Sequence, residues 1–224
     1  MANRLEQLDR ILGCGIVAVV RSPDPAPLID AFFALAEGGV TVAEVTLTVP
    51  RALEVLEKTR AAIGKKMVIG AGTILDAESA RSAILAGAEF IVSPTLNLDG
   101  IAMAHRYDIP VMPGAFSPTE ILTAWEHGAD IIKVFPADVL GPVFFKAMRG
   151  PLPQIRMMPT GGVDTQTALP FLQAGACALG IGSQLIEPTA LEKRDFTRIT
   201  ELAKQYRQIV MNFRQGSTNS PKAL

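Results

Sequence analysis

The chain of 224 residues is 49% apolar, and its 21 Lys and Arg nearly balance 22 Asp and Glu, giving a formal net charge of −1. This length and apolar content suit one (β/α)8 barrel better than two domains. The balanced charge disfavours a nucleic-acid partner, and no apolar run approaches the ~20 residues that span a bilayer.

The pattern of the first ten residues does not predict a signal peptide. Met1–Arg10 mixes both charges and lacks the basic segment, apolar segment and cleavage site of a signal peptide. Residues 3–13 predict an extra helix before the first strand. Cys14 and Cys177 lie among strand-like apolar neighbours, as buried thiols do in a reducing compartment. We therefore expect a cytoplasmic protein.

Short β-branched runs recur along the chain, and a helical stretch follows each one. Successive runs are spaced by about the length of one βα unit. Eight runs are predicted as strands: Ile16–Val20, Ala43–Leu47, Met67–Ala71, Phe90–Val92, Pro110–Met112, Ile131–Phe135, Arg156–Pro159 and Ala178–Ile181.

Amphipathic segments between these runs predict helices, and several end at a glycine suited to a left-handed cap. Clear examples are Ala52–Ile63, Ala77–Ala86, Thr119–Glu126 and Thr165–Gln173. Alternating strands and helices with short connections indicate a parallel sheet covered by helices.

Eight such units favour closure into a single α/β domain, a (β/α)8 TIM barrel over residues 1–214. An open doubly wound sheet is the main alternative, but it leaves two strand edges to protect. The polar stretch Gln215–Leu224 predicts a disordered tail.

Lys133 is the most unusual residue of a predicted strand, because Ile131–Phe135 is otherwise apolar. A lysine among apolar neighbours loses hydration, which favours the neutral amine. A neutral amine can attack a ketone and form a Schiff base. The structural alternative is a lysine that only forms an ion pair with a carboxylate.

Glu44 is the partner candidate, a lone charge in the second predicted strand. With period two, Glu44 and Thr46 share the inward face, and Val45 and Leu47 face the helices. A carboxyl group in a partly dry barrel mouth can take and return protons near neutrality. An ion pair that merely balances Lys133 is the alternative.

Two glycine-rich segments follow the seventh and eighth strands, where barrels often bind phosphate through backbone N–H groups. These are Thr160–Val163 and Gly180–Ser183, in which the Thr160 and Ser183 hydroxyls add possible donors. Arg21, at the end of the first strand, offers a charge for a phosphate or a carboxylate.

The sequence disfavours a metal site and points to no cofactor. His105 and His127 lie in or near helices, and neither has a partner at ligand spacing. The dinucleotide-binding and Walker glycine motifs are also absent.

Six motifs, in order and within Ile16 to Ser183, resemble the 2-dehydro-3-deoxy-6-phosphogluconate (KDPG) and 4-hydroxy-2-oxoglutarate aldolase family. They are Glu44–Pro50, Ile69–Thr73, Ile91–Pro94, Ile132–Ala137, Lys146–Pro151 and Pro159–Val163. The resemblance implies a metal-free class I aldolase of the Entner–Doudoroff pathway, usually a homotrimer. Its substrate would be a phosphorylated 2-keto-3-deoxy sugar acid, cleaved to pyruvate and glyceraldehyde 3-phosphate.

The resemblance also implies roles for individual residues. Lys133 would form the Schiff base, and Glu44 would be the general acid and base. The residues implied to contact substrate are Thr73 and Pro94 near the keto acid, Phe135 beside the lysine, and Gly161, Gly162, Gly182 and Ser183 at the phosphate. Thr160 resembles the gluconate-type enzymes.

One position departs from many members of the family, which carry an arginine for the substrate carboxylate where this chain has Thr48. Carboxylate binding would then rest on Thr48, Thr73, backbone groups or Arg21. The alternatives left open are an aldolase for the galactonate epimer, a phosphosugar epimerase or thiamine-phosphate-type synthase, and a non-catalytic phosphosugar-binding barrel.

Overall fold

In a computed structural model that describes residues 3–218, strands and helices alternate along the chain, as the sequence predicts. The strands are β1 (Ile16–Val20), β2 (Val42–Thr46), β3 (Val68–Gly72), β4 (Ile91–Val92), β5 (Val111–Met112), β6 (Gly114–Ala115), β7 (Ile132–Val134), β8 (Met157–Pro159) and β9 (Leu179–Ile181). The helices are α1 (Arg4–Cys14), α2 (Leu28–Glu37), α3 (Ala52–Ile63), the short 3-10 turn η1 (Gly64–Lys66), α4 (Ala77–Leu85), α5 (Leu98–Arg106), α6 (Pro118–Glu126), α7 (Ala137–Met148), α8 (Ala168–Gln173), α9 (Pro188–Glu192) and α10 (Phe196–Thr218).

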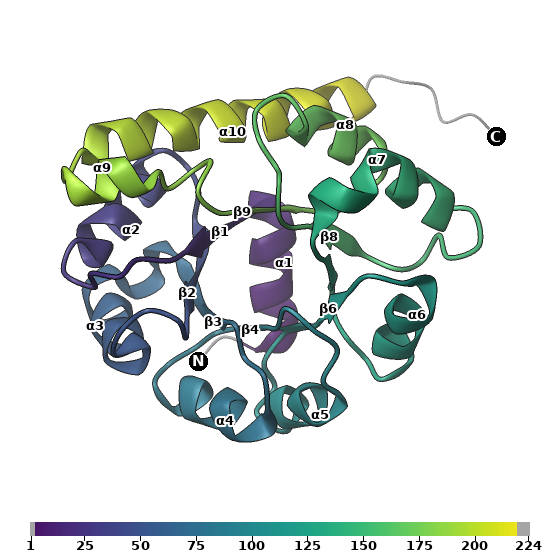
Figure 1. The fold of residues 1–224 in the computed structure, drawn as a ribbon, viewed down its shortest axis with the longest axis horizontal. Helices are drawn as coiled ribbons and strands as arrows, with labels where there is room; N and C mark the ends of the chain where they lie inside the picture. Colours follow the sequence, from purple (N-terminus) through teal and green to yellow (C-terminus); the bar gives the residue numbers. More distant parts are fainter. Residues whose placement is uncertain (1–2, 219–224) are drawn as a thin grey trace.

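The strands pair in parallel and form a curled sheet with helices around its outer side (Figure 1). Six strands follow the order β5-β4-β3-β2-β1-β9, and three follow the order β6-β7-β8. Only Pro113 separates β5 from β6, and a parallel bridge joins Thr160 to Gly180. The sequence predicted one strand at Pro110–Met112. The structure has a second short strand beyond Pro113, since proline has no N–H for a continuous ladder.

Helix α1 lies across the centre of the ring of strands in Figure 1, so the predicted N-terminal helix is present. Its Gln7 Nε2 donates to Glu89 Oε1 at 2.7 Å, and Arg4 Nε lies 2.9 Å from Asp130 Oδ1. Glu89 and Asp130 each come just before a strand. Helix α1 therefore covers the N-terminal end of the sheet and leaves the C-terminal end open.

The C-terminal helix α10 fixes the end of α1. Arg207 donates to the carbonyl of Cys14 at 2.6 Å, and Arg214 donates to the carbonyls of Gly13 and Leu12 at 2.6 Å. Helix α10 continues through Thr218, four residues into the predicted tail 215–224. Residues 219–224 of that tail lie outside the described part of the chain.

We expect Glu89→Ala to lower the free energy of unfolding by ~3 kcal/mol, because a buried charged network would lose its central acceptor. Glu89 is buried and accepts from Gln7, from Arg60 at 2.7 Å and from the Ile69 N–H at 3.0 Å. Urea unfolding measures the change, with exposed Glu57→Ala as the control. Equal midpoints for the two variants would contradict this role.

Candidate active site

Lys133 is the central residue of β7, opposite Gly114 on one side and Met158 on the other. Its side chain is 2% exposed, and its Nζ lies 5.3 Å from the centroid of the Phe135 ring. Burial lowers the pKa of the Lys133 ammonium, and the charge of Arg21 lowers it further, while Glu44 opposes both effects. The environment therefore favours the neutral amine.

Glu44 lies on β2, opposite Val19 of β1 and Gly70 of β3. It is 1% exposed, and neither carboxylate oxygen has a hydrogen-bond partner among residues 3–218. Burial raises the pKa of Glu44, and the positive charges of Lys133 and Arg21 oppose this rise. The carboxyl group lies against Gly72, where a Cβ atom would collide with it.

Lys133 and Glu44 interact through their charges, but no direct ion pair within 4.0 Å joins them among the described residues. Burial shifts the pKa of each group toward its neutral form. An acid and an amine held in this way can exchange protons with a bound molecule rather than only with each other.

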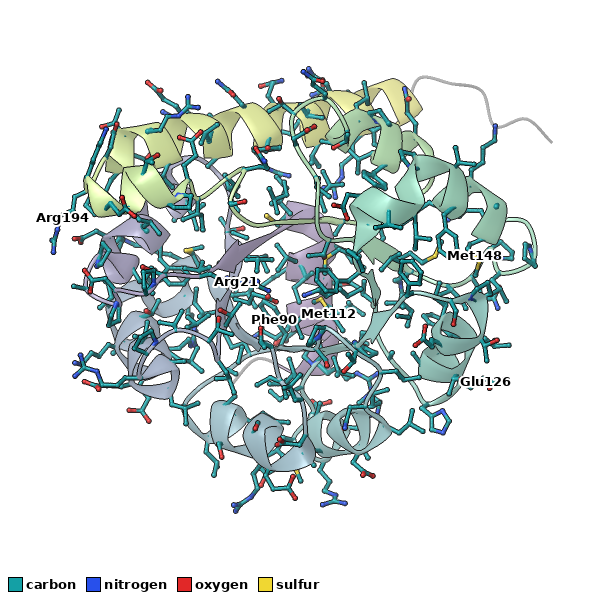
Figure 2. The ribbon with its side chains drawn as sticks, viewed as in Figure 1. Arg21, Phe90, Met112, Glu126, Met148 and Arg194 are labelled. Carbon is teal, nitrogen blue, oxygen red and sulfur yellow. The ribbon has the colours of Figure 1, made fainter. Side chains whose placement is uncertain are left out.

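Apolar side chains fill the interior of the ring below these two groups. Phe90 and Met112 are fully buried, and the Phe90 ring packs against Gly70 so closely that no Cβ atom would fit there. Figure 2 shows Phe90 and Met112 at the centre of the ring, with Arg21 reaching toward it from the end of β1. Because α1 covers the N-terminal ends of the strands, a ligand has to enter from their C-terminal ends.

Two cavities open at those ends and share Arg21 and Pro188. The smaller, of about 390 Å³, brings together most of the predicted substrate-binding residues: Arg21, Phe135, Thr160, Gly161, Gly162, Gly182 and Ser183. The larger, of about 590 Å³, is lined by Arg21 and Thr48 among others. Lys133 and Glu44 line neither cavity, and Lys133 lies directly below Phe135, which lines the smaller one.

The smaller cavity offers unused hydrogen-bond donors. Within residues 3–218, no backbone hydrogen bond uses the N–H of Gly161, Gly162 or Ser183. Gly161 and Gly162 have φ angles of 90° and 70°, which a side chain would strain. The buried Thr160 hydroxyl also has no partner in this part of the chain. Arg21 is the charged residue of the lining, so the cavity suits an anion held mainly by backbone donors.

The structure places the remaining predicted contacts elsewhere. Thr73 follows β3 with a φ of 59°, and the carbonyl of Pro94 packs against Gly114. Both residues are half-buried, and neither lines the two cavities. They lie on the β3 and β4 side of the mouth, whereas the cavities lie beside β8, β9, β1 and β2.

Thr48 uses its hydroxyl within the protein. Thr46 Oγ1 donates to the Val20 carbonyl at 3.2 Å and lies 2.8 Å from Thr48 Oγ1. Either hydroxyl can be the donor of the second bond, so the Thr48 hydroxyl is partnered within the protein in both cases. Thr48 carries no charge and its hydroxyl is bonded to that of Thr46, so it is a poor replacement for an arginine at a substrate carboxylate.

Sequence reasoning missed four residues of the smaller cavity: Val19, Gln184, Ile186 and Pro188. Val19 lies two positions before Arg21 on β1, so strand periodicity could have placed it on the inward face. Gln184 follows Ser183 in a turn whose direction no sequence signal shows.

Between residues 3 and 218, no three His, Cys, Asp or Glu side chains come together as possible metal ligands. In the same part of the chain, no helix has both the length and the apolar content to cross a membrane.

The parallel α/β fold, the buried Lys133 amine and the buried Glu44 carboxyl group suit an aldolase, which is a carbon–carbon lyase. A family model described as KDPG and KHG aldolase matches residues 9–202. The chain belongs to the KDPG and KHG aldolase family.

Individual relatives agree with this membership. A 2-dehydro-3-deoxy-phosphogluconate aldolase of Treponema pallidum is 33% identical over 211 residues, covering 94% of this chain and 99% of the relative. A 2-dehydro-3-deoxy-6-phosphogalactonate aldolase of Escherichia coli is 30% identical over 196 residues, covering 87% of this chain and 96% of the relative. A solved KDPG aldolase of Legionella pneumophila, with pyruvate captured as a covalent carbinolamine intermediate, has a TM-score of 0.80 and 27% identity, covering 88% of this chain and 96% of that one.

Proposed function

We propose that the chain is a class I aldolase that cleaves KDPG to pyruvate and glyceraldehyde 3-phosphate, with 4-hydroxy-2-oxoglutarate as a further substrate. The observation that carries this proposal is the buried Lys133 amine, whose lowered pKa favours the nucleophilic form beside a buried Glu44. Membership of the KDPG and KHG aldolase family supports it.

The first half of the proposed cycle forms the imine. The Lys133 Nζ lone pair attacks the C2 carbonyl carbon of the keto acid, and the carbinolamine loses water to give an iminium. Because the iminium nitrogen is positive, it can accept the electron pair of the C3–C4 bond. The C4 hydroxyl then gives its proton to the Glu44 carboxylate as that bond breaks and the aldehyde leaves.

The second half returns the protons. The remaining enamine takes a proton at C3 from Glu44, directly or through a water molecule. Water then adds to the iminium carbon, the C–N bond breaks, and pyruvate leaves with the Lys133 amine restored. The raised pKa of Glu44 suits a group that must take and return a proton in each cycle.

The phosphate end of the substrate is assigned to the smaller cavity, where the free N–H groups of Gly161, Gly162 and Ser183 would bind it. Arg21 is assigned to the substrate carboxylate in place of the family arginine at position 48. Its charge acts on both Lys133 and Glu44, and the Thr48 hydroxyl is bonded to that of Thr46 instead.

We further propose that the strands close into one eight-stranded (β/α)8 barrel, a single domain over residues 1–214 behind the N-terminal helix. The single residue between β5 and β6 and the Thr160–Gly180 bridge support closure. Assembly into a homotrimer follows from the family resemblance. The cytoplasmic location stays a prediction.

Borohydride reduction in the presence of pyruvate tests the imine step. We expect the peptide that contains Lys133 to gain the mass of a reduced pyruvyl group. Lys146, exposed on α7, serves as the internal control and should stay unmodified. An enzyme that cleaves substrate while its Lys133 remains unmodified would refute the proposed chemistry.

The galactonate epimer is the second candidate substrate, because the Escherichia coli relative is named for it. At Thr160 the chain resembles the gluconate-type enzymes, and this favours KDPG as the substrate. Comparing kcat/KM on the two purified epimers decides between them.

A further inference from the structure

We propose that Thr167, Asp164 and Tyr206 are positioning residues that orient the backbone N–H groups of the two glycine loops toward the substrate phosphate. This inference rests on the proposed function. None of the three side chains lines the cavity, so each would act through the backbone rather than by touching the substrate.

Asp164 and Thr167 lock the loop that follows β8 through reciprocal hydrogen bonds. The Asp164 N–H donates to Thr167 Oγ1 at 2.9 Å, and the Thr167 N–H donates to Asp164 Oδ1 at 2.8 Å. Asp164 Oδ1 also accepts from the Gln166 N–H at 2.9 Å. The Thr167 backbone bond is the main cause that lowers the pKa of Asp164, so the carboxylate stays charged and accepting.

Thr167 extends this lock to the glycines. Its hydroxyl oxygen lies 2.9 Å from Asp164 Oδ1 and 3.2 Å from the Gly162 carbonyl oxygen, so its proton can serve either acceptor. The Gly162 carbonyl and the Val163 N–H belong to one planar trans peptide unit and point in opposite directions. A carbonyl held toward Thr167 therefore turns the Val163 N–H away from α8. Val163 lines the cavity, and no backbone bond within residues 3–218 uses its N–H.

Tyr206 of α10 plays the same part for the loop after β9. Its ring is 1% exposed, and its hydroxyl donates to the Gln184 carbonyl at 3.5 Å, the outer limit of such a bond. The N–H of that same peptide unit, on Leu185, donates to the Gly182 carbonyl at 2.9 Å. Both polar ends of the peptide are thus held, which fixes the turn that presents the free Ser183 N–H.

The surroundings of Tyr206 keep its hydroxyl protonated, so that it can donate a hydrogen bond. Burial is the main cause that raises the pKa of Tyr206 to about 12, and the negative charges of Asp164 and Glu187 add to the rise. Asp164 thus links the two loops, since it bonds to one loop and acts electrostatically on the tyrosine that holds the other. Asp164, Thr167 and Tyr206 therefore hold the two phosphate-binding loops without lining the cavity, and no sequence motif marks them.

Thr167→Val tests the proposal, because it keeps the shape of the side chain and removes the hydroxyl. We expect KM for KDPG and the inhibition constant of inorganic phosphate to rise together by about threefold to tenfold, the scale of one lost hydrogen bond. Borohydride trapping of pyruvate, which has no phosphate, should be unchanged. Thr167→Ser should restore both constants, and exposed Thr165→Val in the same loop is the matched control.

Tyr206→Phe gives an independent readout on the second loop and carries the test alone if Thr167→Val does not fold. We expect the same pattern, with a rise at the low end of that range because the bond is long. Folded variants with wild-type KM and wild-type phosphate inhibition would overturn the inference. An equal effect of Thr165→Val would also overturn it. A wild-type protein that does not cleave KDPG would instead refute the proposed function itself.

Discussion

Lys133→Met is expected to abolish cleavage and to change how the stability of the folded protein depends on pH. Removing a covalent nucleophile costs on the order of 10⁴-fold or more in kcat. Lys133 is also a buried amine, and its burial lowers its pKa. Removing the charged amine from water therefore costs free energy when the protein folds. The substitution removes the cost of burying the amine, but it also leaves Glu44 without the positive charge that opposes the effect of its burial.

The pH dependence gives this expectation a second test. Because the pKa of Lys133 is lowered in the folded state, the unfolded chain binds more protons at pH values between the folded value and the ordinary 10.5. The free energy of unfolding of the wild type therefore rises with pH across that window. The stability of Lys133→Met relative to the wild type should therefore fall as the pH increases.

Steady-state kinetics and urea unfolding at several pH values measure both effects. Lys146→Met is the matched control, since Lys146 is exposed on the neighbouring helix α7. It should leave kcat near the wild-type value and show no pH-dependent change in stability relative to the wild type. A Lys133→Met protein that still cleaves substrate would remove Lys133 from the mechanism.

The strand pattern predicted the two catalytic candidates because burial is a local property of a parallel strand. Lys133 and Glu44 each interrupt a run of apolar residues, and both prove to be buried. The glycine loops were predicted for a similar reason, since their positions follow from the strand order. Seven of the predicted contacts line one cavity.

Other features depend on contacts that no local pattern contains. Helix α8 begins at Ala168, three residues after the predicted Thr165, because the reciprocal bonds of Asp164 and Thr167 form a turn first. The role of Thr48 depends on Thr46 reaching the carbonyl of Val20 on the adjacent strand. Helix α10 contacts α2 and α8 and the end of α1, all distant in the sequence.

Glu44→Gln is the second change with a large expected effect. Glutamine keeps the size of the side chain but cannot accept and return the proton, so we expect kcat to fall by about 10²–10⁴-fold. In the wild type, kcat should rise with pH as Glu44 loses its proton above a raised pKa. In Glu44→Gln, kcat should no longer rise with pH in this way. In the control Glu57→Gln, an exposed position on α3, the rise of kcat with pH should remain.

Glu44 and Lys133 affect the pH dependence of the free energy of unfolding with opposite signs. Because the pKa of Glu44 is raised from 4.5 in the folded state, the folded protein binds more protons than the unfolded chain just above pH 4.5. The free energy of unfolding of the wild type therefore falls as the pH rises through that window. Glu44→Gln removes this loss, so its stability relative to the wild type should increase with pH.

Combining the two substitutions shows whether the amine and the acid act as one unit. In Lys133→Met the imine cannot form, so Glu44→Gln should cause no further loss of kcat in that background. Additive losses would mean that Glu44 serves a step independent of the lysine. The charges of the two groups also stabilise each other within the buried site. A double-mutant cycle of unfolding free energies should accordingly show a coupling that grows as Glu44 ionises.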